Sequence, residues 1–235
     1  MVLMRSFLLA AVLALTPMGL VACAAPSPTQ QVGCGTAGVP CLKGTAVVEL
    51  KTTKGTVELS LDGNAAPLTA GNFVDLVRRG TYNGTVFHRV VKEPIPFVVQ
   101  GGDPQSANPA TPLSALGTGS FNDPSTGQAR YVPLEILLNG ESAPRYGEIT
   151  AGPGQQQRIK LPHDRGALAM ARSNDPNSAS AQFYIALRAL PELDGRYAVF
   201  GRVTKGMEVV DRISQGDKLI SATVLQGGTL VKDAN

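Results

Sequence analysis

The chain has 235 residues, of which 43% are hydrophobic and 17% charged, a composition that supports a folded core and excludes a disordered protein. Gly (26) and Pro (17) are frequent, which favours turns and loops over long helices and excludes a coiled coil. Lys and Arg (21) barely outnumber Asp and Glu (18), so the charge gives no reason to expect a nucleic-acid partner.

Residues 1–22 are typical of an export signal. Arg5 is their one charge, an apolar run covers 7–15, and Leu-Val-Ala stands directly before Cys23. This ending resembles a bacterial lipobox, in which Cys23 would receive lipid and become the mature N-terminus. The alternatives are an ordinary signal peptide and an uncleaved membrane helix, and Pro17 within a short run disfavours the second. We therefore expect an exported, lipid-anchored protein on the periplasmic side of a membrane, or in the thylakoid lumen if the host is photosynthetic.

Residues 23–44 are expected to be a tether between the anchor and the domain. Residues 24–33 are rich in Ala, Pro, Ser, Thr and Gln, a flexible composition. Cys34 and Cys41 are the remaining cysteines, and an even number in an exported protein predicts a disulfide. A metal site would need further ligands, and Lys43 is a poor activator for a catalytic thiol.

The folded domain is expected at 45–235 and begins with a hairpin followed by a helix. Alternating stretches at 45–51 and 56–61 predict the two strands of the hairpin. An amphipathic helix of about three turns follows, with Pro67 suited to its first turn and Gly80 to its end.

Short apolar runs then recur and predict a mainly β fold. They predict strands at 85–91, 97–100, 131–137, 166–171, 182–187, 197–203 and 222–231. A second helix is expected at 207–214. Many short strands with two helices favour a closed antiparallel eight-stranded β-barrel capped by the helices over a βαβ sheet. Two polar stretches, 104–130 and 139–164, are expected to be long surface loops.

Motifs for metal, nucleotide, hydrolytic and redox chemistry are missing from the sequence. It has two histidines, and the pair His163-Asp164 is interpreted as part of a turn. Glu192 and Asp194 are interpreted as solvated charges. No zinc-ligand spacing, glycine-rich phosphate loop or Gly-x-Ser-x-Gly elbow occurs. We therefore expect neither a metal nor a cofactor.

Four segments, taken together in their order, resemble the cyclophilin family of peptidyl-prolyl cis-trans isomerases. They are Phe87-His88-Arg89, Phe97-Val98-Val99-Gln100-Gly101-Gly102-Asp103-Pro104, the stretch 169–185, and the stretch 193–201. The resemblance covers about residues 45–231 and is interrupted by the two long loops. It implies a β-barrel enzyme that binds proline-containing polypeptides and needs no cofactor.

The resemblance implies that Arg89 is the catalytic arginine and that Gln100 positions it. Rotation about an X–Pro bond is slow because amide resonance sets a barrier of roughly 18–20 kcal/mol. A donor aimed at the proline nitrogen stabilises the twisted form more than either planar form. The alternative for Arg89 is a surface arginine in an ordinary salt bridge.

The resemblance also implies a set of substrate-binding positions around Arg89. They are Phe97, Val98, Ala171, Arg172, Gln182, Tyr184, Leu193, Tyr197 and His88. For any single apolar member, core packing is the alternative, and only the set favours a pocket for a proline ring. The segment between Arg89 and Phe97 is longer than in compact family members. Glu192 stands where many members have Trp or Phe, a position that helps to bind cyclosporin, so we expect weak inhibition.

Two further functions compete with isomerisation. The same groove could hold proline segments with little turnover, as a chaperone or assembly factor would. The long loops could recruit one specific partner to a scaffold. In each case we expect a monomer that contacts the membrane through the lipid on Cys23.

Overall fold

The computed structural model describes residues 33–34, 38–152, 154 and 158–231. The expected signal peptide at 1–22 and Cys23 lie outside these residues. The helices are α1 (Pro67–Arg78) and α2 (Met207–Arg212). Within the described ranges, neither helix has the length and apolar character that crossing a membrane requires.

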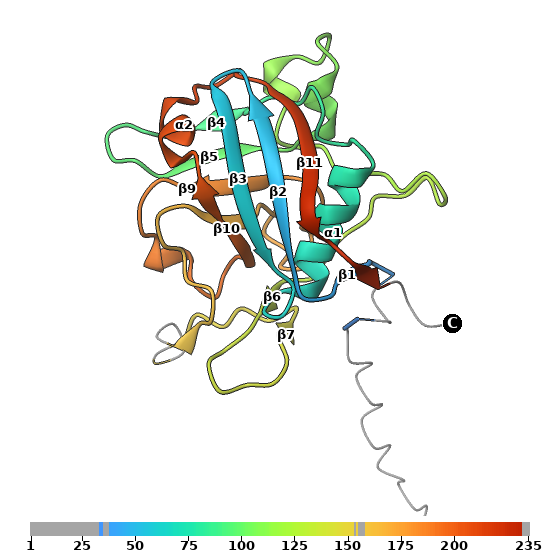
Figure 1. Ribbon diagram of the computed structural model, residues 1–235, viewed down its shortest axis with the longest axis vertical. Helices are drawn as coiled ribbons and strands as arrows, with labels where there is room; N and C mark the ends of the chain where they lie inside the picture. Colours follow the sequence, from blue (N-terminus) through green and yellow to red (C-terminus); the bar gives the residue numbers. More distant parts are fainter. Residues whose placement is uncertain (1–32, 35–37, 153, 155–157, 232–235) are drawn as a thin grey trace, which may run out of the picture. The chain divides into compact units, whose positions relative to one another are not determined.

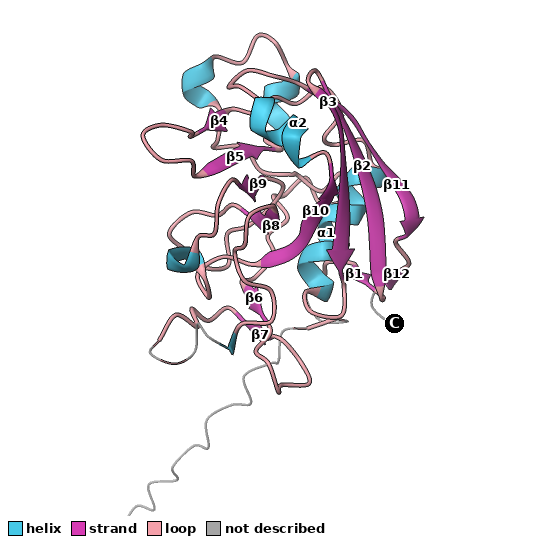
Figure 2. Ribbon diagram, turned by 60° about the vertical axis from the view of Figure 1, so that its left-hand side comes forward, coloured by secondary structure: helices cyan, strands magenta, loops and turns pink. Residues whose placement is uncertain are grey.

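An antiparallel sheet of eight strands forms the centre of the fold (Figures 1 and 2). Across the sheet the strands are β11 (Leu219–Gly227), β2 (Thr45–Thr52), β3 (Gly55–Asp62), β10 (Val199–Lys205), β8 (Ala167–Met170), β9 (Phe183–Ala186), β5 (Val98–Gly101) and β4 (Arg89–Val90). The eight antiparallel strands and two helices were expected, but the closed barrel was not correct. The edge strands β4 and β11 share no ladder, and the segment before β4 meets the start of β11 through the isolated bridge between Val86 and Lys218.

The sheet does not close between β4 and β11 because β4 is short. Only Arg89 and Val90 pair with β5, and Pro94 and Pro96 follow closely. Proline has no backbone N–H to donate to a ladder, so the strand cannot continue through this segment. Before Arg89 the backbone bonds to the segment at the start of β11, with the Phe87 N–H donating to the Asp217 carbonyl at 2.9 Å and the Leu219 N–H to the Thr85 carbonyl at 2.8 Å. Only two residues of the expected strand at 85–91 therefore belong to β4.

A second expected strand, 131–137, is also short, because its first half meets the segment 176–179 only through an isolated bridge between Val132 and Ala179. Val132, Leu134, Ile136 and Leu138 are all buried, as the alternation predicts. Only β6 (Glu135–Ile136) forms a ladder, with β7 (Arg145–Tyr146). Alternation reports which side chains are buried, but a strand also needs a neighbour along its length.

Helix α1 packs into the concave side of the sheet around an aromatic cluster. The Phe73 ring lies 5.0 Å from Tyr82, 5.4 Å from Phe183 and 5.2 Å from Phe200, measured between ring centroids. All four rings are fully buried. This cluster joins the helix to β9 and β10, the strands that lead into the site described below.

Part of the expected tether is packed against this helix. The strand β1 (Cys41–Leu42) pairs with β12 (Leu230–Val231) and is buried. It crosses α1 at Gly71, where a side-chain methyl would collide with the Pro40 carbonyl. The packed chain thus begins before the expected domain boundary at residue 45.

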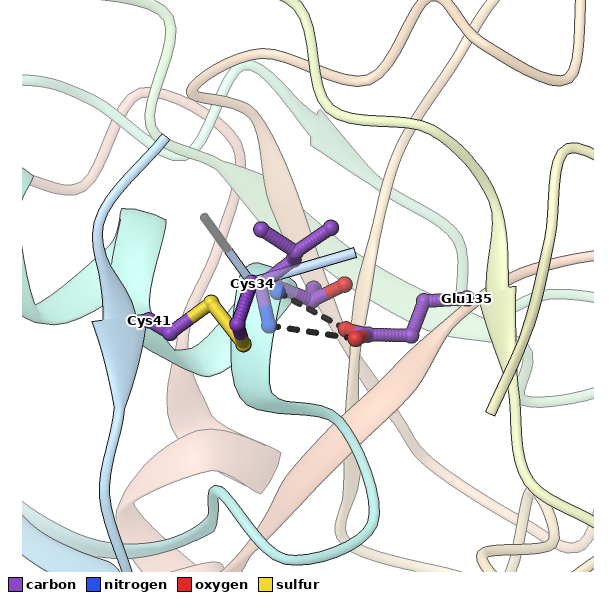
Figure 3. The surroundings of a disulfide bond; sticks show 5 residues. Cys34, Cys41 and Glu135 are labelled. Carbon is purple, nitrogen blue, oxygen red and sulfur yellow. Dashed lines mark hydrogen bonds between the residues drawn. A yellow bond between two sulfur atoms is a disulfide. The ribbon is translucent and has the colours of Figure 1, made fainter. Parts of the chain in front are cut away.

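A disulfide joins Cys34 to Cys41 beside the first turn of α1 (Figure 3). Their Cα atoms are 5.8 Å apart. On the other side of that turn, the buried Glu135 carboxylate accepts backbone N–H bonds from Leu68 (3.1 Å) and Thr69 (2.8 Å). The disulfide closes a loop within the N-terminal segment, and the two hydrogen bonds tie β6 to the first turn of the helix.

The two long loops are partly buried rather than wholly exposed. The buried Asp103 carboxylate accepts N–H bonds from Gly117 (2.6 Å) and Gly119 (3.2 Å), which fixes part of loop 104–130. In loop 139–164, Ile159 and His163 are buried. Both loops therefore contribute fixed segments to the surroundings of the pocket.

Candidate functional site

Nine of the eleven residues expected in the catalytic and substrate-binding set line one open pocket of about 260 Å³. They are Arg89, Phe97, Val98, Gln100, Ala171, Arg172, Tyr184, Leu193 and Tyr197. They come from β4, β5, β9, the end of β8 and the segment before β10. The structure thus brings together residues that are up to 108 positions apart in the sequence.

Strand register explains why three of these residues meet. Arg89 in β4 lies directly across from Gln100 in β5, and Gln100 lies across from Tyr184 in β9. Side chains directly opposite in adjacent strands point to the same face of a sheet. The three side chains therefore form one row across the pocket.

A chain of hydrogen bonds orients the guanidinium of Arg89. Its Nη1 donates to Oε1 of Gln100 at 3.3 Å, and Nε2 of Gln100 donates to Oε1 of Gln182 at 3.2 Å. Nε2 of Gln182 donates in turn to the Gly119 carbonyl at 2.9 Å. Arg89 remains exposed, and its guanidinium lies 5.7 Å from the centre of the Phe97 ring. The arrangement holds a permanent cation at the mouth of an apolar hollow.

The wall of the hollow is apolar and partly aromatic. Val98 and Tyr184 are buried, and Phe97, Leu193 and Tyr197 pack against them. The Tyr184 and Tyr197 rings meet edge to face with centroids 5.9 Å apart. Such a surface suits a small apolar ring and offers few polar groups to water.

Arg172 holds the rim of the pocket from the other side. Its Nε and Nη2 donate to the Arg196 carbonyl at 3.0 and 2.7 Å, and Nη1 donates to the Ser173 carbonyl at 2.7 Å. Its guanidinium lies 4.6 Å from the centre of the Tyr197 ring. Because the cation is used in these contacts, we assign Arg172 to the shape of the rim.

Gln182 and His88 do not line this pocket. Gln182 lines an adjoining pocket of about 400 Å³, which shares Gln100, Ala171 and Arg172 with the first. His88 lies outside the lining of both pockets, and its half-buried ring faces Gly117. Adjacent residues in an extended chain point to opposite sides, so His88 faces away when Arg89 faces the pocket. Burial lowers the pKa of His88.

A buried histidine behind the pocket was not foreseen as part of the site. Nε2 of His163 lies 2.9 Å from the Tyr184 hydroxyl, and its Nδ1 lies 2.8 Å from Oδ1 of Asp194. Asp194 is buried as well, so its interpretation as a solvated charge was wrong. No regular spacing links these positions, which lie 21 and 31 residues from His163.

Comparison with known proteins gives the family. The family model described as "Cyclophilin type peptidyl-prolyl cis-trans isomerase/CLD" matches residues 47–231. A provisionally named thylakoid lumen peptidyl-prolyl cis-trans isomerase of Synechocystis sp. is 38% identical over 209 residues, covering 85% of this chain and 52% of that protein. The chloroplastic peptidyl-prolyl cis-trans isomerase CYP38 of Arabidopsis thaliana is 39% identical over 207 residues, covering 80% of this chain and 44% of that protein. The chain thus spans about half the length of these two relatives.

A solved structure agrees with the fold. The crystal structure of a Cryptosporidium parvum cyclophilin-type isomerase in the presence of the dipeptide Ala-Pro is 26% identical, with a TM-score of 0.52. The alignment covers 80% of this chain and 99% of that one. With the family model matching most of the sequence, the chain belongs to the family of cyclophilin-type peptidyl-prolyl cis-trans isomerases.

Proposed function

We propose that the chain is a peptidyl-prolyl cis-trans isomerase and that the nine-residue pocket is its active site. The observation that carries this proposal is the Arg89 guanidinium, exposed at the edge of an apolar pocket and hydrogen-bonded to Gln100. All nine residues of this pocket were expected from the resemblance of the sequence to the family.

Catalysis follows from the electronic change during rotation. When the X–Pro bond twists, the proline nitrogen loses conjugation and gains a lone pair. The Arg89 guanidinium donates a hydrogen bond to that lone pair, which exists only in the twisted form, so the bond lowers the barrier. Gln100 holds the guanidinium in place, and arginine stays charged at any physiological pH. No bond is broken, so the step needs no nucleophile.

The substrate is a proline-containing polypeptide. The ring of the proline rests on Phe97, Val98, Tyr184 and Leu193, and the peptide backbone continues toward Ala171 and Gln182. The related structure obtained in the presence of Ala-Pro supports this substrate class. Tyr197 and Arg172 close the rim.

The test is the rate of isomerisation of a proline peptide by the full chain and its Arg89→Ala variant. We expect kcat/KM to fall about 100-fold, the effect of removing one donor that acts in the transition state. Because Arg89 is exposed, the melting temperature should change little. The matched control is Arg202→Ala, an exposed arginine in β10 outside the pocket. Equal rates for Arg89→Ala and the unmodified chain would remove Arg89 from the mechanism.

A second candidate function is binding of proline segments with little turnover, as a chaperone or assembly factor would act. It is favoured by Glu192, whose exposed carboxylate pairs with Arg188 at 2.7 Å next to the pocket residue Leu193. A charge at this edge leaves one side of the groove without an aromatic wall. Binding of a proline peptide by the unmodified chain, without any increase in the rate of X–Pro isomerisation, would support this function over catalysis.

We further propose that the protein is exported and held at a membrane by lipid on Cys23, as a monomer. The names of two relatives place those proteins in the thylakoid lumen and the chloroplast, compartments reached by export or import. The lipobox-like ending at residues 20–23 supports the anchor. An extracytoplasmic location also suits the disulfide between Cys34 and Cys41.

A further inference from the structure

Three buried polar side chains form a hydrogen-bonded row directly behind the pocket. The Tyr184 hydroxyl, the His163 ring and the Asp194 carboxylate follow one another at 2.9 and 2.8 Å. The backbone N–H of His163 also donates to Oδ1 of Asp194 at 2.8 Å. All three residues are buried, which makes their mutual bonds the means by which their polar atoms are satisfied.

The carboxylate fixes the direction of the bond between His163 and Asp194. An ionised carboxylate only accepts, so Nδ1 of His163 carries the proton that is donated to Asp194. Nε2, which lies 2.9 Å from the Tyr184 hydroxyl, can then accept the proton of that hydroxyl. Burial raises the pKa of Tyr184 well above its ordinary value, which keeps that proton in place. Every polar atom of the imidazole ring thus has a partner.

The row connects two segments that line the pocket. The Tyr184 ring lines the pocket from β9, and Asp194 directly follows Leu193, which lines it from the segment before β10. His163 stands between them at the end of loop 139–164, and its carbonyl accepts the N–H of Leu190 at 2.7 Å. One histidine residue therefore contacts β9 through Tyr184 and the segment 190–194 through Leu190 and Asp194.

We propose that His163 is a positioning residue of the active site, which sets the separation between Tyr184 and the segment 193–197. The inference rests on the proposed function, because it assigns the histidine a role in shaping the pocket for the proline ring. The proposal also assigns the end of loop 139–164 a role in substrate binding. This role differs from the recruitment of a partner, which the sequence analysis considered for the long loops.

The experiment compares three single variants of the full chain. Tyr184→Phe keeps the ring and removes the hydroxyl. His163→Asn retains an amide that can reach Asp194 but is too short to reach Tyr184. Tyr82→Phe is the matched control, since its buried hydroxyl donates to the Ala181 carbonyl at 2.9 Å and does not line the pocket.

We expect KM for a proline peptide to rise about fivefold in Tyr184→Phe and in His163→Asn, the factor that one net hydrogen bond represents. The kcat value should stay within about twofold, because neither group touches the proline nitrogen. The double variant should be no worse than either single variant, since both remove the same bond. Tyr82→Phe should lower the melting temperature and leave KM unchanged.

A spectroscopic measurement separates positioning from a purely structural role. The chain has only two histidines, so ring ¹⁵N resonances of His163 can be told from those of His88. Saturation with an Ala-Pro peptide should shift the His163 ring signals. Unshifted signals, or KM values equal to that of Tyr82→Phe, would overturn the positioning role. Full turnover by Arg89→Ala would instead show that the active site itself is misplaced.

Discussion

A single charged residue changes which ligands the pocket can hold. Glu192 is exposed, and its own backbone N–H and the Arg188 guanidinium hold its pKa below the usual range, so it is charged at neutral pH. Cyclosporin should therefore inhibit the chain weakly. Glu192→Trp should tighten inhibition about tenfold, the order of one added aromatic contact. Inhibition curves for turnover measure both values, with Glu208→Trp in α2 as the control. Low-nanomolar inhibition of the unmodified chain would contradict the expectation.

At the scale of residues, the sequence motifs predicted the side chains that line the pocket but not the buried side chains behind it. Arg89, Gln100 and Tyr184 were expected because they stand within segments that resemble the family, and the sheet register brings them together. His163 and Asp194 were each interpreted as surface features. Their roles depend on hydrogen bonds between a loop, a strand and a turn. Such long-range contacts produce no periodic pattern in the sequence. His88 was included in the expected site only because it stands beside Arg89 in the motif. Its side chain faces Gly117 and not the pocket.

At the scale of elements, the attachment of α1 to β6 predicts a dependence on pH. Burial raises the pKa of Glu135, although the backbone N–H groups of Thr69 and Leu68 favour its charged form. The folded state thus holds this proton to a higher pH than the unfolded chain. Its contribution to stability is complete below the unfolded value of about 4.3 and is lost as pH rises through the folded value.

Urea denaturation from pH 4 to 8 measures this contribution. The free energy of unfolding of the native chain should fall relative to that of Glu135→Gln as pH rises through this range. Glu208→Gln, an exposed glutamate in α2, should follow the native chain at every pH. A constant difference between Glu135→Gln and the native chain would show that Glu135 does not titrate in this range.

Elements with local signals were predicted well. The hairpin of β2 and β3 and the helix α1 follow from alternation, from Pro67 and from the apolar face of the helix. Strands at 85–91 and 131–137 were predicted too long, because alternation also arises where the backbone meets its neighbours only through isolated bridges. The packing of β1 was not expected, since its only signals are two buried residues and Gly71 in the helix that it crosses.

On the scale of the whole molecule, the proposed anchor on Cys23 would decide in which compartment the chain is held. Cys23→Ser should abolish incorporation of a labelled fatty acid and move the protein from the membrane fraction to the soluble extracytoplasmic fraction. Turnover by the purified protein should not change, because the described residues that line the pocket lie between positions 89 and 197. Cys34→Ser, which removes a different cysteine, should leave lipid labelling intact. Labelling that persists in Cys23→Ser would exclude this residue as the lipid carrier.

The expected barrel followed from the number and length of the apolar runs, and the eight antiparallel strands agree with it. Closure depends instead on the outermost strand. The outermost strand β4 has only two residues and shares no ladder with β11, so the sheet stays open at that edge.

The pairing of β1 with β12 has a topological consequence. Cys41 lies opposite Val231, so the two ends of the described fold run side by side. A short linker between them would turn the chain into a ring, and cutting that ring at an exposed loop tip such as 124–127 would give a circular permutant with every ladder of the sheet retained.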